Sequence, residues 1–145
     1  MKKIFKIILI AFAILIIVGV VFAGIVFMNL TAYTATGSET LTATGQEMGK
    51  ALVVYDPGLT GAAKDVADKI ALNLQTTGYT VNFAGIKSNA ASNTADYNII
   101  VAGGPIYAGA PTSSVKDFLN NLSNVQNVKV GVFGSGSGAQ EQIDI

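Results

Sequence analysis

The sequence lacks cysteine, histidine, tryptophan and arginine altogether, and its 145 residues include only three prolines. Without cysteine the chain forms no disulfide, offers no thiolate nucleophile or thiolate metal ligand, and gives no sign of its redox compartment. Without histidine it lacks the usual general base and the usual zinc ligand, so acid–base chemistry would depend on other side chains. This composition favours binding over acid–base catalysis.

An excess of either charge is missing as well, because nine lysines balance nine acidic residues. Lys2, Lys3 and Lys6 precede the longest apolar run, which leaves six lysines and nine acids in the rest of the chain. That remainder is mildly acidic and shows no basic face of the kind that binds DNA or RNA. We therefore expect no nucleic-acid partner.

The apolar run extends from Ile7 to Met28, 22 residues without a charged or strongly polar side chain. As a helix it would be roughly 33 Å long, enough to cross a hydrocarbon core of about 30 Å. It predicts a transmembrane anchor over residues 1–30. The alternative is a signal peptide cleaved after Ala23 or Ala32, but the apolar cores of signal peptides run only about 7–15 residues.

The lysines also predict the orientation of the anchor, because basic residues precede the span and none follows it until Lys50. The N-terminus should stay in the cytoplasm and the domain should lie outside. Residues 31–49 are mostly Thr, Ala, Gly and Ser without usable periodicity, which predicts a flexible linker. Residues 50–145 then form a single domain.

Strand and helix patterns alternate within residues 50–145. Short apolar runs predict strands, and apolar residues at helical spacing predict helices that begin near Ala63 and Thr112. A β-α-β succession requires parallel strands with right-handed crossovers, so we expect an open α/β sheet. Its strands are expected at residues 51–55, 79–84, 97–102 and 128–133.

Three glycine-rich loops follow predicted strands, at residues 56–61, 103–111 and 134–138. In open parallel sheets, ligands bind in the crevice outside the carboxyl ends of the strands. We therefore expect the three loops to converge on one site.

From residue 50 to about residue 138 the sequence resembles the flavodoxin family. The resemblance rests on ALVVYDPGLTGAAKDVADKIALNL, DYNIIVAGGPIYAGAPTSSVKDFLNNL and VKVGVFGSGSG, of which the middle block is the most specific. It implies a flavodoxin-like open parallel sheet in the order 2-1-3-4, FMN as the cofactor, and electron transfer with an unidentified redox protein partner. The cofactor would carry the redox chemistry, and the protein would bind and orient it.

The resemblance also implies the residues that hold FMN. The phosphate would lie at the start of the first domain helix, where backbone N–H groups are unpaired, near Gly58, Thr60, Gly61, Ala62 and Ala63. Tyr107 would stack on the flavin ring. The residues around the ring would be Pro105, Ile106, Tyr107, Gly109, Gly134, Ser135 and Gly136.

Two positions depart from the Thr/Ser-x-Thr-Gly-x-Thr phosphate loop of flavodoxins, since Gly58 and Ala63 stand where hydroxyls are expected. The Asp56 carboxylate would also oppose a phosphate about 6–8 Å away by roughly 1–2 kcal/mol. We therefore expect weak FMN binding, which Gly58→Ser and Ala63→Thr should tighten. If Gly58 instead needs a positive φ, serine there would strain the turn and only the Ala63 change would be informative. The alternative is a non-redox binding or structural module that kept the fold and lost the flavin.

In the flavodoxin family a fifth strand and a last helix follow, whereas this sequence ends soon after the fourth strand. The missing last helix would lie beside the domain helix that begins near Ala63. We therefore expect uncovered apolar side chains on that face of the sheet, which favours self-association. Two other motif matches fail. Asp56-Pro57-Gly58 lacks the second Asp of dehalogenase-like phosphatases, and no helix can follow residues 134–138 as a dinucleotide loop requires.

Overall fold

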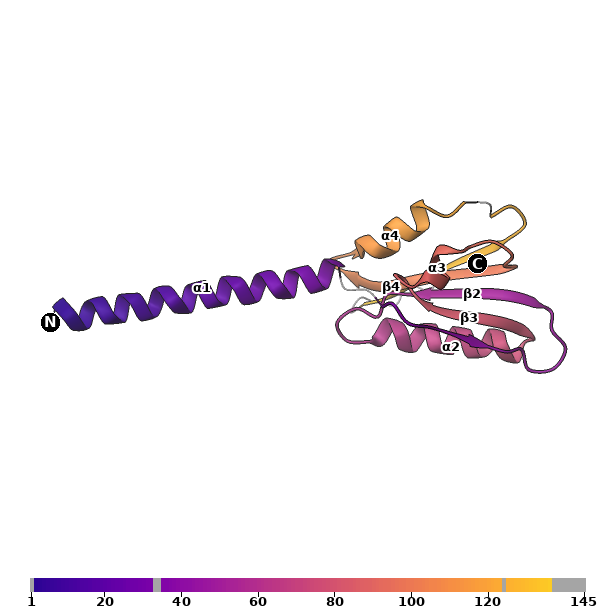
Figure 1. Ribbon diagram of the computed structural model, residues 1–145, viewed down its shortest axis with the longest axis horizontal. Helices are drawn as coiled ribbons and strands as arrows, with labels where there is room; N and C mark the ends of the chain where they lie inside the picture. The colour runs from indigo at the N-terminus through magenta and orange to yellow at the C-terminus, as the bar shows by residue number, and fades with distance from the viewer. Residues whose placement is uncertain (1, 33–34, 124, 137–145) are drawn as a thin grey trace.

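The computed structural model describes residues 2–32, 35–123 and 125–136, whose arrangement is shown in Figure 1. Ser137 and Gly138, which belong to the third predicted loop, lie outside the described residues. In chain order the elements are α1 Lys2–Ala32, β1 Ser38–Leu41, β2 Gly49–Tyr55, α2 Ala62–Thr76, β3 Tyr79–Gly85, α3 Asn89–Ser92, β4 Ile99–Tyr107, β5 Ala110–Pro111, α4 Ser113–Asn120 and β6 Lys129–Ser135.

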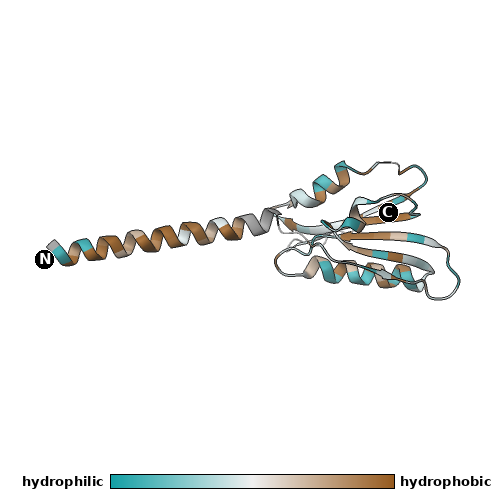
Figure 2. Ribbon diagram, viewed as in Figure 1, coloured by the Kyte–Doolittle hydropathy of each residue, from teal (hydrophilic) through white to brown (hydrophobic). Residues whose placement is uncertain are grey.

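α1 is a continuous helix of 31 residues that projects away from the sheet (Figure 1). Its stretch from Lys3 to Phe27 is long and apolar enough to cross a membrane, and none of that stretch is buried in the protein. Figure 2 shows apolar residues along nearly its whole length. This confirms the predicted long apolar N-terminal helix, a feature that membrane anchors and signal sequences share.

Four parallel strands form the centre of the sheet, in the spatial order β3-β2-β4-β6. This is the predicted order 2-1-3-4, and it arises because α2 connects β2 to β3 while α4 connects β4 to β6 on the opposite face. The sheet as a whole is mixed. β1 pairs antiparallel with β3 at one edge, and β5 forms a short antiparallel hairpin with β4.

β1 corrects the expectation of a flexible linker over residues 31–49. Residues 38–41 pair with residues 81–84 of β3, and the Thr40 hydroxyl donates a hydrogen bond to the Asn82 side-chain oxygen at 2.8 Å. The strand is mostly exposed, and Leu41 is its one side chain packed against the core. So little apolar surface leaves no pattern to detect in the sequence. The predicted order 2-1-3-4 places β3 at an edge of the sheet, whereas its pairing with β1 makes it internal.

α2 lies on one face of the sheet. Its buried side chains are three alanines, Ala63, Ala67 and Ala71, spaced four residues apart on one stripe. Their small size lets the helix lie close to the strands, where Val53 and Phe83 belong to the core on this side.

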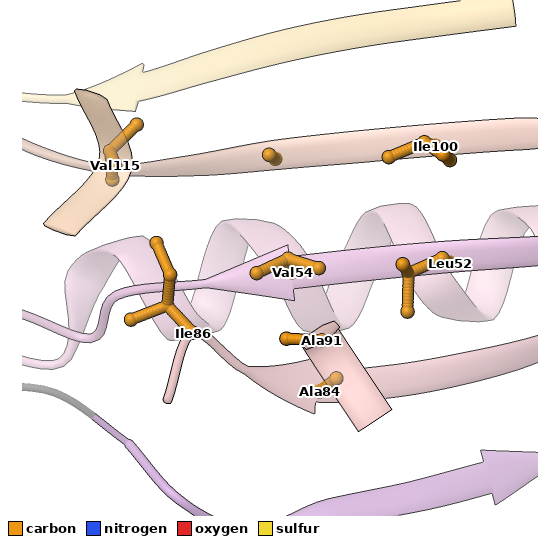
Figure 3. Packing of buried hydrophobic residues seen from close by; sticks show 8 residues of the cluster. Leu52, Val54, Ala84, Ile86, Ala91, Ile100 and Val115 are labelled. Carbon is orange, nitrogen blue, oxygen red and sulfur yellow. The ribbon is translucent and has the colours of Figure 1, made fainter. Parts of the chain in front are cut away.

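α3 and α4 cover the other face. Figure 3 shows Leu52 and Val54 of β2 beside Ile100 of β4, with Val115 of α4 at one end of the cluster. Because successive residues of a strand point to opposite faces, Val53 packs toward α2 while its neighbours pack toward α4. The central strand is thus buried on both faces, as its continuous apolar run predicts.

β4 is longer than predicted. Residues 103–111 were expected to form a loop, but β4 continues to Tyr107 and turns back into β5. Gly103 lies within β4, and a glycine is needed there because the neighbouring strand β6 lies very close. A Cβ at that position would be 2.2 Å from the backbone oxygen of Phe133. The glycine serves close packing of two strands rather than loop flexibility.

The β4–β5 hairpin turns through Ala108 and Gly109, whose φ angles of 50° and 78° are both left-handed. This is the pattern of a type I′ turn. An alanine is strained there by roughly 1–2 kcal/mol. We expect Ala108→Gly to stabilise the domain by up to about 1 kcal/mol, because the added freedom of the unfolded chain offsets part of the relief.

The matched control is Ala95→Gly, which changes another exposed alanine that has no positive φ. It should destabilise the domain by about 0.5–1 kcal/mol through the unfolded chain alone. Urea unfolding of the full chain in detergent measures both. Effects of the same sign would contradict strain at the turn.

Among the described strands, β6 pairs with β4 alone, so its outer edge is open. Val130 and Val132 are 45% and 68% exposed. They lie in register with Ile100 and Ala102 and so share the face of α4, whereas the uncovered side chains were expected on the face of α2. On the α2 face, Phe133 packs against the core instead. Self-association through the sheet stays a prediction.

Candidate functional site

The carboxyl ends of β2, β4 and β6 bring the predicted loops to one edge of the sheet. The loop at residues 56–61 packs against the end of β4, where a Cβ at Gly58 would lie 2.7 Å from Cγ of Pro105. On the other side of β4, a Cβ at Gly134 would lie 2.9 Å from Cγ1 of Ile106. The structure therefore brings the first two segments and the described part of the third, residues 134–136, together around the last residues of β4.

Most of the residues predicted around a flavin ring lie in strands rather than in loops. Pro105, Ile106 and Tyr107 end β4, and Gly134 and Ser135 end β6. Gly136 follows β6 and lies against Ile106, while Gly109 is exposed in the hairpin turn with open space at its Cβ position.

Asp56 is the buried polar group of this edge, with 1% of its surface exposed. Its carboxylate accepts hydrogen bonds from the Gly58 N–H at 3.0 Å, from the Thr112 hydroxyl at 2.9 Å and from the Ser114 hydroxyl. Thr112 is the N-cap of α4, so the carboxylate also lies at the positive end of that helix dipole.

This cluster changes the expected role of Asp56. The carboxylate turns toward α4 and its charge is matched by three donors, which weakens the repulsion of a phosphate that the sequence suggests. The cluster ties the first loop to the start of α4. Sequence reasoning missed it because its partners lie 56 and 58 residues apart and nothing local marks them.

Tyr107 extends from the end of β4 to the first loop. Its hydroxyl oxygen accepts the Leu59 N–H at 3.1 Å and would lie 2.8 Å from a Cβ at Gly58. Gly58 has a left-handed φ of 61°. Glycine is therefore required there for two reasons: the left-handed backbone disfavours other residues, and Pro105 and Tyr107 leave no space for a Cβ. A serine at this position would strain the loop, which is the alternative expected for a positive φ at Gly58, so Gly58→Ser is not expected to tighten FMN binding.

The start of α2 offers unpaired backbone donors. The helix follows Gly61, and the Ala62 N–H donates to the Thr60 hydroxyl over a long 3.4 Å. Within the described part of the chain, the N–H groups of Gly61, Ala63 and Lys64 have no acceptor. Unpaired N–H groups at the positive end of a helix dipole attract anions.

The side chain of Ala63 points away from this anion site. It is 1% exposed and is one of the buried alanines of α2. A threonine there would force a hydroxyl and a methyl group into a packed interior rather than toward a phosphate. The expected gain from Ala63→Thr is therefore corrected as well, and only the backbone N–H of Ala63 remains available. The side chains of Thr60 and Ala62 are exposed.

Lys64 lies in the first turn of α2, but its ammonium group is directed along the helix to Asp68 at 2.8 Å. It also lies 5.8 Å from the centre of the Tyr55 ring and 5.3 Å from that of Phe83. The hydrogen bond to Asp68 raises the pKa of Lys64, and burial raises the pKa of Tyr55. Lys64 therefore stays charged at neutral pH, yet its charge is engaged away from the loop.

A separate groove of about 370 Å³ opens between α3 and α4. α3 is only four residues long, so it leaves the face beside α4 open. The groove includes none of the residues predicted to hold FMN, and it borders the site only through Ser114, the partner of Asp56. Its lining includes Ile86, Lys87, Ala91, Asp117, Phe118 and Leu122.

Comparison with known proteins agrees with this arrangement. The profile of a family described as Flavodoxin domain matches residues 52–144. The matched span begins within β2 and includes α2, the β4–β5 hairpin, α4 and β6, which together build the carboxyl edge. No significant match was found among curated proteins or among solved structures.

Proposed function

The chain belongs to the flavodoxin domain family, and from this premise we propose that it binds FMN at the carboxyl edge of its sheet and transfers electrons at a membrane. FMN would supply the one- or two-electron chemistry. The residues of this chain would bind the phosphate, border the ring and limit water around it. An unidentified redox protein would exchange electrons with the bound flavin.

The start of α2 is the observation that carries the proposal. Three N–H groups without an acceptor among the described residues lie in the helix's first turn and in its N-cap, next to the exposed hydroxyl of Thr60. A phosphate monoester would accept from these donors and lie at the positive end of the helix dipole. No arginine is needed for such a site. Open space at the Cβ position of Gly61 leaves room for the anion.

The ring would then lie near the ends of β4 and β6, bordered by Ile106, Tyr107 and Gly136. Ile106 and Tyr107 are half-buried, so part of each side chain can contact a ligand. The Tyr107 hydroxyl accepts the Leu59 N–H, and this hydrogen bond would hold the Tyr107 side chain between the phosphate loop and the flavin ring.

Thr60→Val tests the phosphate site. It removes a hydroxyl and preserves shape, so it should weaken FMN binding about fivefold, which corresponds to roughly 1 kcal/mol. Riboflavin lacks the phosphate, so it should bind more weakly than FMN and be insensitive to the change. Fluorescence titration of both flavins with the full chain in detergent measures this.

The matched control is Thr42→Val, because Thr42 is also exposed but follows β1 at the opposite end of the sheet. It should leave both affinities unchanged. An equal loss for FMN and riboflavin in Thr60→Val would place the phosphate elsewhere.

We also propose that α1 remains attached as a single-pass anchor, with its N-terminus in the cytoplasm and the domain outside. Lys2, Lys3 and Lys6 precede the span and Lys50 is the next lysine, as the positive-inside rule requires for this orientation. Protease added to intact cells should then remove the domain. Protection that is lost only on lysis would reverse the orientation.

A non-redox module is the second candidate, and one observation favours it. Two N–H groups of the first loop are already paired internally, that of Gly58 with Asp56 and that of Leu59 with Tyr107. The loop is thus partly closed without a ligand. If neither flavin binds the full chain at high micromolar concentration, the domain would serve as a binding or structural module instead.

A further inference from the structure

The chain that leaves α1 attaches at once to the carboxyl edge of the sheet. The Ala35 carbonyl accepts the Lys87 N–H at 2.9 Å, and the Gly37 carbonyl accepts the Gly85 N–H at 2.8 Å. Gly85 is the last residue of β3, and Lys87 follows it. α1 itself ends at Ala32. Only two residues therefore separate the end of the helix from a backbone contact at the edge where the candidate site lies.

These lengths hold the edge near the bilayer surface. From Phe27, where the apolar stretch ends, to Ala32, the helix rises about 7–8 Å. That is roughly the thickness of one headgroup layer, about 5–8 Å. From Ala32 to Ala35 a fully extended chain spans at most about 10 Å. With α1 in a bilayer, Ala35, which accepts the Lys87 N–H just beyond β3, would thus lie within about 10 Å of the outer border of the headgroups.

The direction of the strands agrees with this. In Figure 1, β2 and β4 point toward the end of the domain from which α1 leaves, so the loops after these strands lie on that side. The tip of the first loop carries Leu59, an apolar side chain that is 51% exposed. Lys87 and Lys116 are exposed on the same side and suit phosphate headgroups.

We propose that the carboxyl edge of the sheet rests on the lipid surface that holds α1, with Leu59 entering the headgroup layer. This rests on the proposed anchoring by α1. A flavin at this edge would face the membrane, so its electron-transfer partner would approach in the plane of the bilayer rather than from bulk solvent.

The natural absence of cysteine allows a direct test with single labelled cysteines in the full chain, reconstituted into phosphatidylcholine vesicles. A label at Leu59→Cys reports whether the carboxyl edge of the sheet contacts lipid. Leu72→Cys is the matched control, because Leu72 is 52% exposed and lies on α2 toward its far end. Ile16→Cys, in the middle of α1, reports insertion of the anchor. Each cysteine carries a fluorophore, and spin-labelled lipids quench those that lie in the bilayer.

We expect strong quenching at Ile16 and severalfold more quenching at Leu59 than at Leu72 with a shallow spin label. Equal quenching at Leu59 and Leu72, with Ile16 quenched, would overturn the lipid-facing edge and leave the anchor intact. An unquenched Ile16 would overturn the anchoring and, with it, the inference that depends on it.

Discussion

Asp56→Ala is expected to destabilise the domain by about 3 kcal/mol, one of the largest effects of any single change at this edge. The substitution removes a buried carboxylate that accepts three hydrogen bonds, and it leaves the hydroxyls of Thr112 and Ser114 with only each other as partners, at 3.0 Å. Hydrogen bonds to a charged group contribute about 1.5–3 kcal/mol each, and they are not additive within one cluster. Urea unfolding of the full chain in detergent, followed by tyrosine fluorescence, measures the loss.

Asp65→Ala is the matched control. Asp65 is an exposed carboxylate in the first turn of α2, so its removal should cost about 0.5 kcal/mol or less. Asp56→Asn should fall between the two, because an amide keeps one acceptor for the Gly58 N–H. A loss in Asp56→Ala no larger than that in Asp65→Ala would mean that the cluster does not hold the loop to α4.

Gly58→Ala is expected to destabilise the domain by roughly 2–5 kcal/mol, for two separable reasons. The left-handed φ of 61° strains any residue with a Cβ, and that Cβ would lie 2.7 Å from Cγ of Pro105. Tyr107 can move its hydroxyl, whereas the proline ring is held in β4. Gly58→Ser should be no better, although it restores the hydroxyl found in flavodoxin phosphate loops.

Gly61→Ala separates the two reasons. Gly61 is also left-handed, with a φ of 77°, but its Cβ position meets no atom within 4 Å. Gly61→Ala should therefore destabilise the domain only through backbone strain, by about 1–2 kcal/mol. The difference between the two variants isolates the packing of Pro105 against the loop, and equal losses would show that the contact is absent in solution.

The parallel strands were predictable because the apolar runs and helical stripes are long and the β-α-β succession requires right-handed crossovers. Their order 2-1-3-4 followed from the resemblance to the flavodoxin family. β1 was not predictable. Its sequence, SETL, has one apolar residue, and pairing with β3 holds it in place. The extension of β4 was missed because Gly103 suggests a loop. In the structure Gly103 lies in the strand, where only a residue without a Cβ leaves space for the backbone of Phe133.

At the candidate site, the positions of the loops could be predicted but their contacts could not. Local sequence cannot show that Asp56 meets Thr112, or that Leu59 meets the Tyr107 hydroxyl, since 48 or more residues separate these partners. The orientation of Ala63 was open to prediction. It shares its stripe with Ala67 and Ala71, and a residue on the buried stripe of a helix does not face a ligand at its end.

The absorption spectrum of FMN mixed with the full chain in detergent tests the central claim most directly. If FMN binds at the carboxyl edge, its visible band should shift and sharpen as the ring leaves water, and Thr60→Val should require more protein for the same change. A spectrum identical to that of free FMN at every protein concentration up to high micromolar would contradict the flavin-binding account.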